Sequence, residues 1–68
     1  MPIHVTINGE PRTLNAPLTV AGLLEVLGLV RGKVAVERNL EIVPRSTYGE
    51  VAVADGDAFE IVRFIGGG

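Results

Sequence analysis

The sequence AFEIVRFIGGG occupies residues 58–68 and joins the strongest strand signal of the chain to three consecutive glycines. Residues 58–65 are rich in aromatic and β-branched side chains, which predicts a β-strand. Alternate side chains of a strand point to opposite faces, so Phe59 and Ile61 fall on one face and Val62 and Phe64 on the other. We expect this strand to lie at the centre of a sheet.

The apolar face formed by Val62 and Phe64 has no helix to cover it, because a single helix covers only one face of a sheet. Such an apolar face predicts either an exposed apolar patch or a face covered by loop residues. With Glu60 and Glu41 as an acidic rim, this face would form a docking surface with an apolar centre. We expect it to bind a protein partner, and ordinary surface exposure is the alternative.

The first residues of the chain predict a β-hairpin. Ile3, Val5 and Ile7 alternate with polar residues, which is typical of a strand with one buried face. The following Asn8-Gly9 favours the positive-φ turns that join antiparallel strands. Residues 12–14 are expected to supply the returning strand.

The next segment carries the helix signal of the sequence. Thr19 stands in the N-cap position before an apolar stripe with i, i+3, i+4, i+7 spacing, and Gly28 is a typical helix terminator. The stripe consists of Val20, Leu23, Leu24 and Leu27. Leu29 or Val30 is expected to pack beside the helix end. Gly22 lies inside the helix, and the favoured interpretation is close packing against a strand.

The remaining residues predict shorter strands at 34–36 and 41–43 and turns at 38–39 and 55–57. Residues 45–50 are expected to form a polar loop, in which the Tyr48 hydroxyl lies near water. A hairpin, one helix and further strands predict an α+β domain with the helix packed across a mixed sheet. If the first and last strands are parallel neighbours, the helix belongs to the crossover between them. This arrangement is the β-grasp, or ubiquitin-like, fold. We expect residues 1–65 to form the domain and residues 66–68 a flexible tail.

Composition excludes several functional classes. The chain has 68 residues, no cysteine and a net charge of −2, and its arginines are scattered along the sequence. Nucleic acid is therefore not an expected partner. The sequence has no apolar run long enough for a membrane span and no pattern typical of a signal peptide. We therefore expect a cytoplasmic protein that does not bind membranes.

The sequence offers little catalytic chemistry of its own. His4 alternates with core positions, so we expect it to face solvent or a partner, and one histidine without cysteine does not hold a typical transition metal. Asp55-Gly56-Asp57 lacks the remaining ligands of a calcium loop. Residues 28–33 follow a helix instead of opening one, which argues against a phosphate-binding loop. We expect no catalytic residue, no metal and no bound cofactor, and therefore not an enzyme.

The glycine tail suggests a different kind of chemistry. A terminal carboxylate at Gly68 is ionised at neutral pH and can attack the α-phosphate of ATP, which gives an activated acyl-adenylate. A sulfur donor that displaces AMP would leave a thiocarboxylate on the protein. Gly66 and Gly67 carry no Cβ, so the tail can enter a narrow channel in a partner. Ordering the tail costs several kcal/mol, at about 1–2 kcal/mol per residue, so we expect the globular face to supply the affinity.

The chain closely resembles the ThiS family, the sulfur carrier proteins of bacterial thiamine biosynthesis. The matching segments are VTINGE at 5–10, LTV at 18–20 with its leucine stripe, KVAVERN at 33–39, IVPR at 42–45, DGDAFEIV at 55–62 and the glycines at 66–68. No single segment is specific, whereas their order, their spacing and the short length are.

The resemblance implies a β-grasp fold and adenylation of Gly68 by a ubiquitin-activating-like, ThiF-type adenylyltransferase that uses ATP. Conversion to the thiocarboxylate with a persulfide sulfur donor and transfer to a ThiG-type thiazole synthase would follow. Three alternatives stay open: the small subunit of molybdopterin synthase, a ubiquitin-like modifier, and a plain β-grasp interaction domain.

Overall fold

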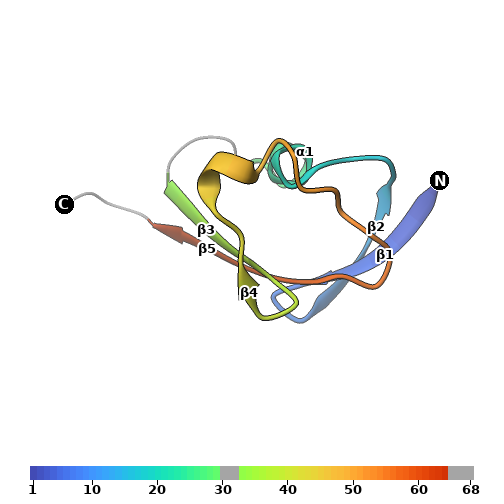
Figure 1. Ribbon diagram of the computed structural model, residues 1–68. Coiled ribbons are helices and arrows are strands. Elements are labelled where there is room, and N and C mark those ends of the chain that lie inside the picture. Colours follow the sequence, from blue (N-terminus) through green and yellow to red (C-terminus); the bar gives the residue numbers. More distant parts are fainter. Residues whose placement is uncertain (30–32, 65–68) are drawn as a thin grey trace.

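The computed structural model describes residues 1–29 and 33–64, and these residues form one mixed sheet with a helix across one face (Figure 1). The sheet has the strand order β2-β1-β5-β3-β4. The elements are β1 (Pro2–Ile7), β2 (Glu10–Asn15), α1 (Val20–Val26), β3 (Lys33–Arg38), β4 (Glu41–Ile42), the 3₁₀ helix η1 (Arg45–Thr47) and β5 (Ala58–Phe64). The α+β class and the central position of the last strand are confirmed.

The predicted N-terminal hairpin is present and longer than expected. β1 pairs antiparallel with β2 over six residue pairs, from Pro2 opposite Asn15 to Ile7 opposite Glu10. Asn8 and Gly9 form the turn with φ values of 52° and 83°. Pro11 is accommodated because β2 is an edge strand, where a missing N–H leaves no gap in the hydrogen-bond ladder.

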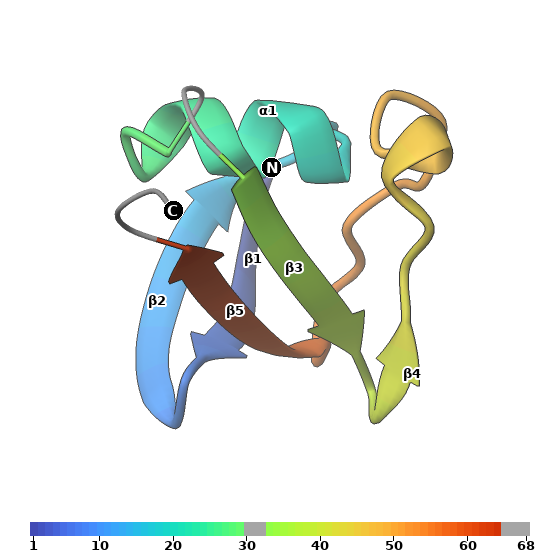
Figure 2. The same ribbon diagram turned by 90° about the vertical axis from the view of Figure 1, so that its left-hand side faces the viewer.

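The strand β1 also pairs with β5 in parallel, which confirms the predicted crossover. This pairing covers only two positions, where Thr6 faces Ala58 and Ile7 faces Phe59. The rest of β5 continues beyond the end of β1 and pairs along its other side with β3, from Arg38 opposite Phe59 to Lys33 opposite Phe64. Figure 2 shows β5 between β3 and the N-terminal hairpin, with α1 above the sheet.

The helix begins and ends where the sequence predicts. The Thr19 hydroxyl oxygen accepts a hydrogen bond from the Gly22 N–H at 3.2 Å, which caps the first turn. At the other end Gly28 has a φ of 74°, and the Leu29 N–H donates to the Leu24 carbonyl at 2.8 Å. Leu29 packs partly buried against the core, as expected, while Val30 lies outside the described residues.

The interpretation of Gly22 as a close contact with a strand is wrong. A Cβ at this position would meet side-chain atoms of Leu18 at 3.5 Å and Thr19 at 3.8 Å, both within the helix entrance and both at ordinary van der Waals distance. The space around Gly22 therefore does not require glycine.

The core lies between α1 and the covered face of the sheet. Its least exposed side chains are Val20, Leu23, Val36 and Phe59, and full burial of such a side chain stabilises the fold by roughly 1.5–3 kcal/mol. The other core residues are Ile3, Val5, Leu14, Leu24, Val34, Val43, Val53 and Ile61. Apart from Val43 and Val53, which lie outside the strands and the helix, these are the positions that the strand and helix periodicities select. The apolar pattern of the sequence therefore accounts for most of the core.

Candidate functional site

The face of the sheet opposite α1 carries the exposed apolar side chains of β5. Phe59 and Ile61 are buried under the helix, whereas Val62 is 55% exposed and Phe64 is 59% exposed. Glu60, Val62 and Phe64 alternate with the core residues, so they share the uncovered face. The structure thus places three of the four predicted docking residues together.

The register of β3 and β4 adds further residues to this face. Lys33 lies opposite Phe64, Ala35 opposite Val62 and Glu37 opposite Glu60, while Ile42 of β4 lies opposite Glu37. We call this surface the open face; it consists of Lys33, Ala35, Glu37, Ile42, Glu60, Val62 and Phe64. Ile42 is 76% exposed, so the apolar area is wider than the sequence analysis predicted. The alternation with buried Val34 and Val36 was the signal that could have placed Ala35 and Glu37 here.

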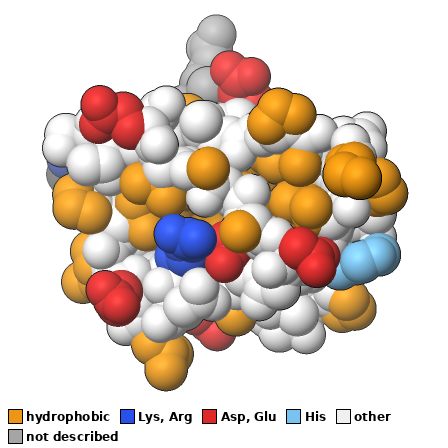
Figure 3. Space-filling view, turned by 45° about the vertical axis from the view of Figure 1, so that its right-hand side comes forward, with side chains coloured by type: hydrophobic (Ala, Val, Ile, Leu, Met, Phe, Trp, Pro, Cys, Tyr) orange, Lys and Arg blue, Asp and Glu red, His pale blue; other side chains and the backbone are white. Residues whose placement is uncertain are grey.

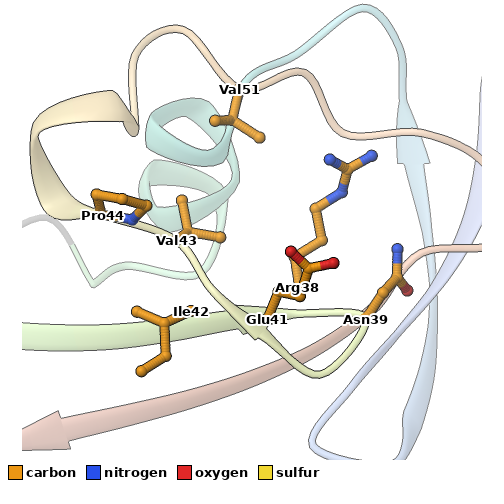
Figure 4. Close-up of a pocket in the computed structure, with 7 residues that line it drawn as sticks. All are labelled: Arg38, Asn39, Glu41, Ile42, Val43, Pro44 and Val51. Carbon is orange, nitrogen blue, oxygen red and sulfur yellow. The ribbon is translucent and has the colours of Figure 1, made fainter.

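The structure does not bring Glu41 to the open face. Glu41 pairs with Arg38, and both lie on the side of the sheet that carries the core. Figure 4 shows Ile42 pointing away from Val43, with Glu41 on the other side of the same short strand. There it helps to line a shallow pocket of about 270 Å³, whose other lining residues are Arg38, Asn39, Ile42, Val43, Pro44 and Val51. The acidic end of the open face is instead formed by Glu37 and Glu60.

The start of β5 is fixed by a buried carboxylate. Asp57 is only 5% exposed, and its carboxylate accepts hydrogen bonds from Arg38 Nε at 2.9 Å, Asn39 Nδ2 at 3.1 Å and the Ala54 N–H at 2.8 Å. Burial by itself raises the pKa of Asp57, but these hydrogen bonds and the Arg38 charge outweigh burial, so the pKa lies below its ordinary value. The network ties the turn before β5 to the turn after β3.

The middle of β5 is held by the side chain of Asn8. Its amide donates to the Ile61 carbonyl at 3.0 Å and accepts from the Ile61 N–H at 2.7 Å. An adjacent strand would make the same two hydrogen bonds with its backbone. From the sequence, Asn8 is predicted only as a turn residue, because a contact across 53 positions leaves no local signal.

Three residues to which the sequence assigns no catalytic or metal-binding role make structural contacts. The Asp55 carboxylate accepts from the His4 N–H at 2.7 Å, which closes the turn at 55–57, and the exposed His4 ring lies 3.3 Å from the Thr13 hydroxyl. The Tyr48 ring packs partly buried against the core, and its hydroxyl donates to the Val34 carbonyl at 3.1 Å, a contact that the sequence did not predict. Within residues 1–29 and 33–64 there is no group of three or more His, Asp or Glu side chains placed to hold a metal ion.

Gly66, Gly67 and Gly68 lie outside the described residues, so the structure describes only the strand that precedes them in the sequence. Phe64 is the last residue of β5, and Figure 1 shows this strand running out from under the helix, toward the end of the molecule opposite the N-terminus. In the sequence, Ile65 and then the glycines follow the strand that contributes Glu60, Val62 and Phe64 to the open face.

The surface carries no concentration of basic side chains on the face shown in Figure 3. Hydrophobic side chains are spread there in small groups, with acidic side chains at several separate positions and one basic group near the centre. Among the described residues, no helix is long and apolar enough to cross a membrane.

This architecture defines a small β-grasp protein with an uncovered apolar sheet face. The chain belongs to the ThiS family, whose model matches residues 5–68. The sulfur carrier protein ThiS of Bacillus subtilis is 46% identical over 50 residues, which cover 74% of this chain and 76% of that protein. The crystal structure of a thiamine biosynthesis protein (ThiS) from Geobacter metallireducens superposes with a TM-score of 0.80 at 38% identity, and covers 97% of this chain and 100% of that one.

Two longer proteins are also similar. A thiazole synthase of Paramagnetospirillum magneticum is 62% identical over 66 residues, and one of Magnetococcus marinus is 52% identical over 68 residues. The chain spans 20% of the length of each of these relatives. The match to these two proteins is therefore confined to a region about the size of this chain.

Proposed function

We propose that this chain is a sulfur carrier protein of thiamine biosynthesis, in which the carboxylate of Gly68 is the group that carries the sulfur. The observation that carries the proposal is the exposure of Val62 and Phe64 at the end of β5, two residues before the first of the three glycines in the sequence. One central strand provides exposed apolar side chains for docking, and the sequence continues after it through Ile65 to glycines, which a narrow active site can admit. Gly66 and Gly67 are the residues that would thread into the partner.

The chemistry proceeds in three balanced steps. A carboxylate oxygen of Gly68 attacks the α-phosphate of ATP, so that pyrophosphate leaves and an acyl-adenylate forms. The terminal sulfur of a persulfide then attacks the acyl carbon and AMP leaves, which joins carrier and donor through an acyl disulfide. A thiol reduces this S–S bond, and the products are the thiocarboxylate and a mixed disulfide on the donor.

The carrier is a substrate of partner enzymes in this proposal and has no catalytic residue or bound cofactor of its own. An adenylyltransferase of the ThiF type would bind ATP, and a synthase of the ThiG type would receive the sulfur. Similarity to proteins named thiazole synthase supports the second partner. The open face, with Val62, Phe64 and Glu60 among its residues, would supply affinity, since ordering the tail opposes binding.

Intact-mass measurement tests the proposal. The protein is incubated with ATP, the adenylyltransferase and a persulfide donor from the same organism, and replacement of one oxygen by sulfur adds about 16 Da. A variant with one alanine added after Gly68 is the matched control, because it keeps the domain and moves the carboxylate. Conversion of this variant at the same rate as the unmodified chain would contradict the assignment of Gly68.

A further inference from the structure

The edge of β5 that faces β1 is only partly occupied. The backbone of β1 ends its pairing at Ile7 opposite Phe59, and the Asn8 N–H donates to the Phe59 carbonyl at 2.8 Å. The Asn8 side chain then occupies the next position along the edge, at Ile61. After Asn8 the chain turns away through Gly9 into β2.

The N–H and C=O groups of Arg63 point to the same edge of β5 as those of Ile61. In a strand, successive N–H and C=O groups alternate between the two neighbours, so residues 59, 61 and 63 address one side and residues 60, 62 and 64 the other. The hydrogen bonds of Phe59 and Ile61 to Asn8 identify the first side as that of β1. In the described part of the chain, no hydrogen bond from this side reaches the Arg63 N–H or C=O.

We propose that the Arg63 edge of β5 is a β-augmentation site, at which an extended segment of an enzyme that receives the tail adds to the sheet. This inference rests on the proposed function for the identity of the partner. The protein already holds a peptide-like group on this edge, since the Asn8 carboxamide bonds both backbone groups of Ile61. Arg63 presents the same pair of groups about 7 Å further along, at about 3.3 Å per residue.

The flanking side chains define the chemistry of the segment. A strand added beside Arg63 places alternate side chains on the open face, next to exposed Val62 and Phe64. The segment is therefore extended, with backbone N–H and C=O groups directed at Arg63 and an apolar side chain directed at Val62 and Phe64. Backbone pairing at Arg63 fixes the segment relative to β5, while the apolar contacts add affinity.

Amide hydrogen exchange by NMR tests the inference in the unmodified chain. In the protein alone, the Arg63 amide should exchange at nearly the unstructured rate, while the Val62 amide, which addresses β3, is protected. With saturating adenylyltransferase or thiazole synthase from the same organism, the Arg63 amide should slow by at least about tenfold in one of the complexes. Unchanged exchange in both complexes would overturn the inference. Protection in the concentrated protein alone would assign the edge to a second copy and would also overturn it.

A pair of variants measures the contribution of this one donor. Arg63→Pro removes the N–H, and Arg63→Ala is the matched control because it loses the same charge and keeps the N–H. The proline faces an unpaired edge, where strands tolerate it. Affinity for the partner should fall about two- to tenfold from Ala to Pro, as expected for one hydrogen bond.

Two further experiments distinguish a folding defect of the variants from a loss of partner binding. Circular dichroism confirms that both variants fold, and N-methylalanine at position 63 of a synthetic chain replaces the proline variant if that variant does not fold. Equal affinity of the N-methylated and alanine chains would refute the inference. If the unmodified chain still gains sulfur in that case, the proposed function stands while the edge site fails.

Discussion

Replacing Asp57 with alanine tests how far the start of β5 depends on one buried carboxylate. The change removes the acceptor of three hydrogen bonds, from Arg38, Asn39 and the Ala54 N–H. Removing one partner of a buried ion pair typically costs 3–5 kcal/mol, and Arg38 is one-third exposed and can regain water, so we expect a loss of about 3 kcal/mol. A domain of this size is stable by roughly 3–10 kcal/mol, so this loss is a large share of the total.

Urea unfolding followed by far-ultraviolet circular dichroism measures the effect. With a slope near 1 kcal/mol per molar urea, a loss of this size lowers the unfolding midpoint by about 2–3 M. Asp55→Ala is the matched control in the same turn, because the Asp55 carboxylate is exposed and accepts a single hydrogen bond from the His4 N–H. We expect the control to lose about 1 kcal/mol. Equal losses in the two variants would refute the account of Asp57.

The same variant has a defined pH dependence. Because the pKa of Asp57 is lowered in the folded protein, its carboxylate stabilises the fold above its unfolded pKa of about 3.8, and this contribution is lost as the pH falls through the folded value. The difference in unfolding free energy between the unmodified chain and Asp57→Ala should therefore shrink from pH 7 to pH 3. A difference that stays constant or grows would show that the charge of Asp57 is not what stabilises the turn.

Three other changes address the surface. Phe64→Ala should leave the unfolding free energy within about 0.5 kcal/mol, since the ring is 59% exposed, and should weaken binding to a partner enzyme about tenfold in a titration; unaltered affinity would remove Phe64 from the docking surface. Leu40→Gly should stabilise the fold by about 0.5–1 kcal/mol in urea unfolding, because Leu40 has a φ of 71° and is 90% exposed; a loss of stability would mean that its side chain packs. Glu37→Gln should raise the unfolding free energy by roughly 0.2–0.5 kcal/mol, because it removes the repulsion between the carboxylates of Glu37 and Glu60, which lie opposite each other. Adding Glu60→Gln should raise it little further, and additive gains would show that the two carboxylates do not interact.

The sequence predicted the fold wherever burial follows a simple period. Alternation in Ile3, Val5 and Ile7 and the helical spacing of Leu23 and Leu24 match the core of the structure, because the covered sheet face and the helix stripe are each selected by burial on one side. Alternation in residues 58–64 likewise located Glu60, Val62 and Phe64 on the open face, but not its four residues from β3 and β4.

The predictions failed at one tight turn and at contacts between distant residues. Glu41 follows a turn in which Asn39 and Leu40 both have positive φ, and this turn sets the register that turns Glu41 away from the open face. The bonds of Asp57 to Arg38 and of Asn8 to Ile61 join residues 19 and 53 positions apart. Neither composition nor periodicity specifies such pairs.

The central claim is that the carboxylate of Gly68 carries sulfur, and the mass of the intact chain tests it most directly. After reaction with ATP, the adenylyltransferase and a persulfide donor, we predict a product heavier by about 16 Da whose added mass maps to Gly68 in the C-terminal peptide. A chain that keeps its original mass under conditions in which the partner enzymes are active would contradict the account.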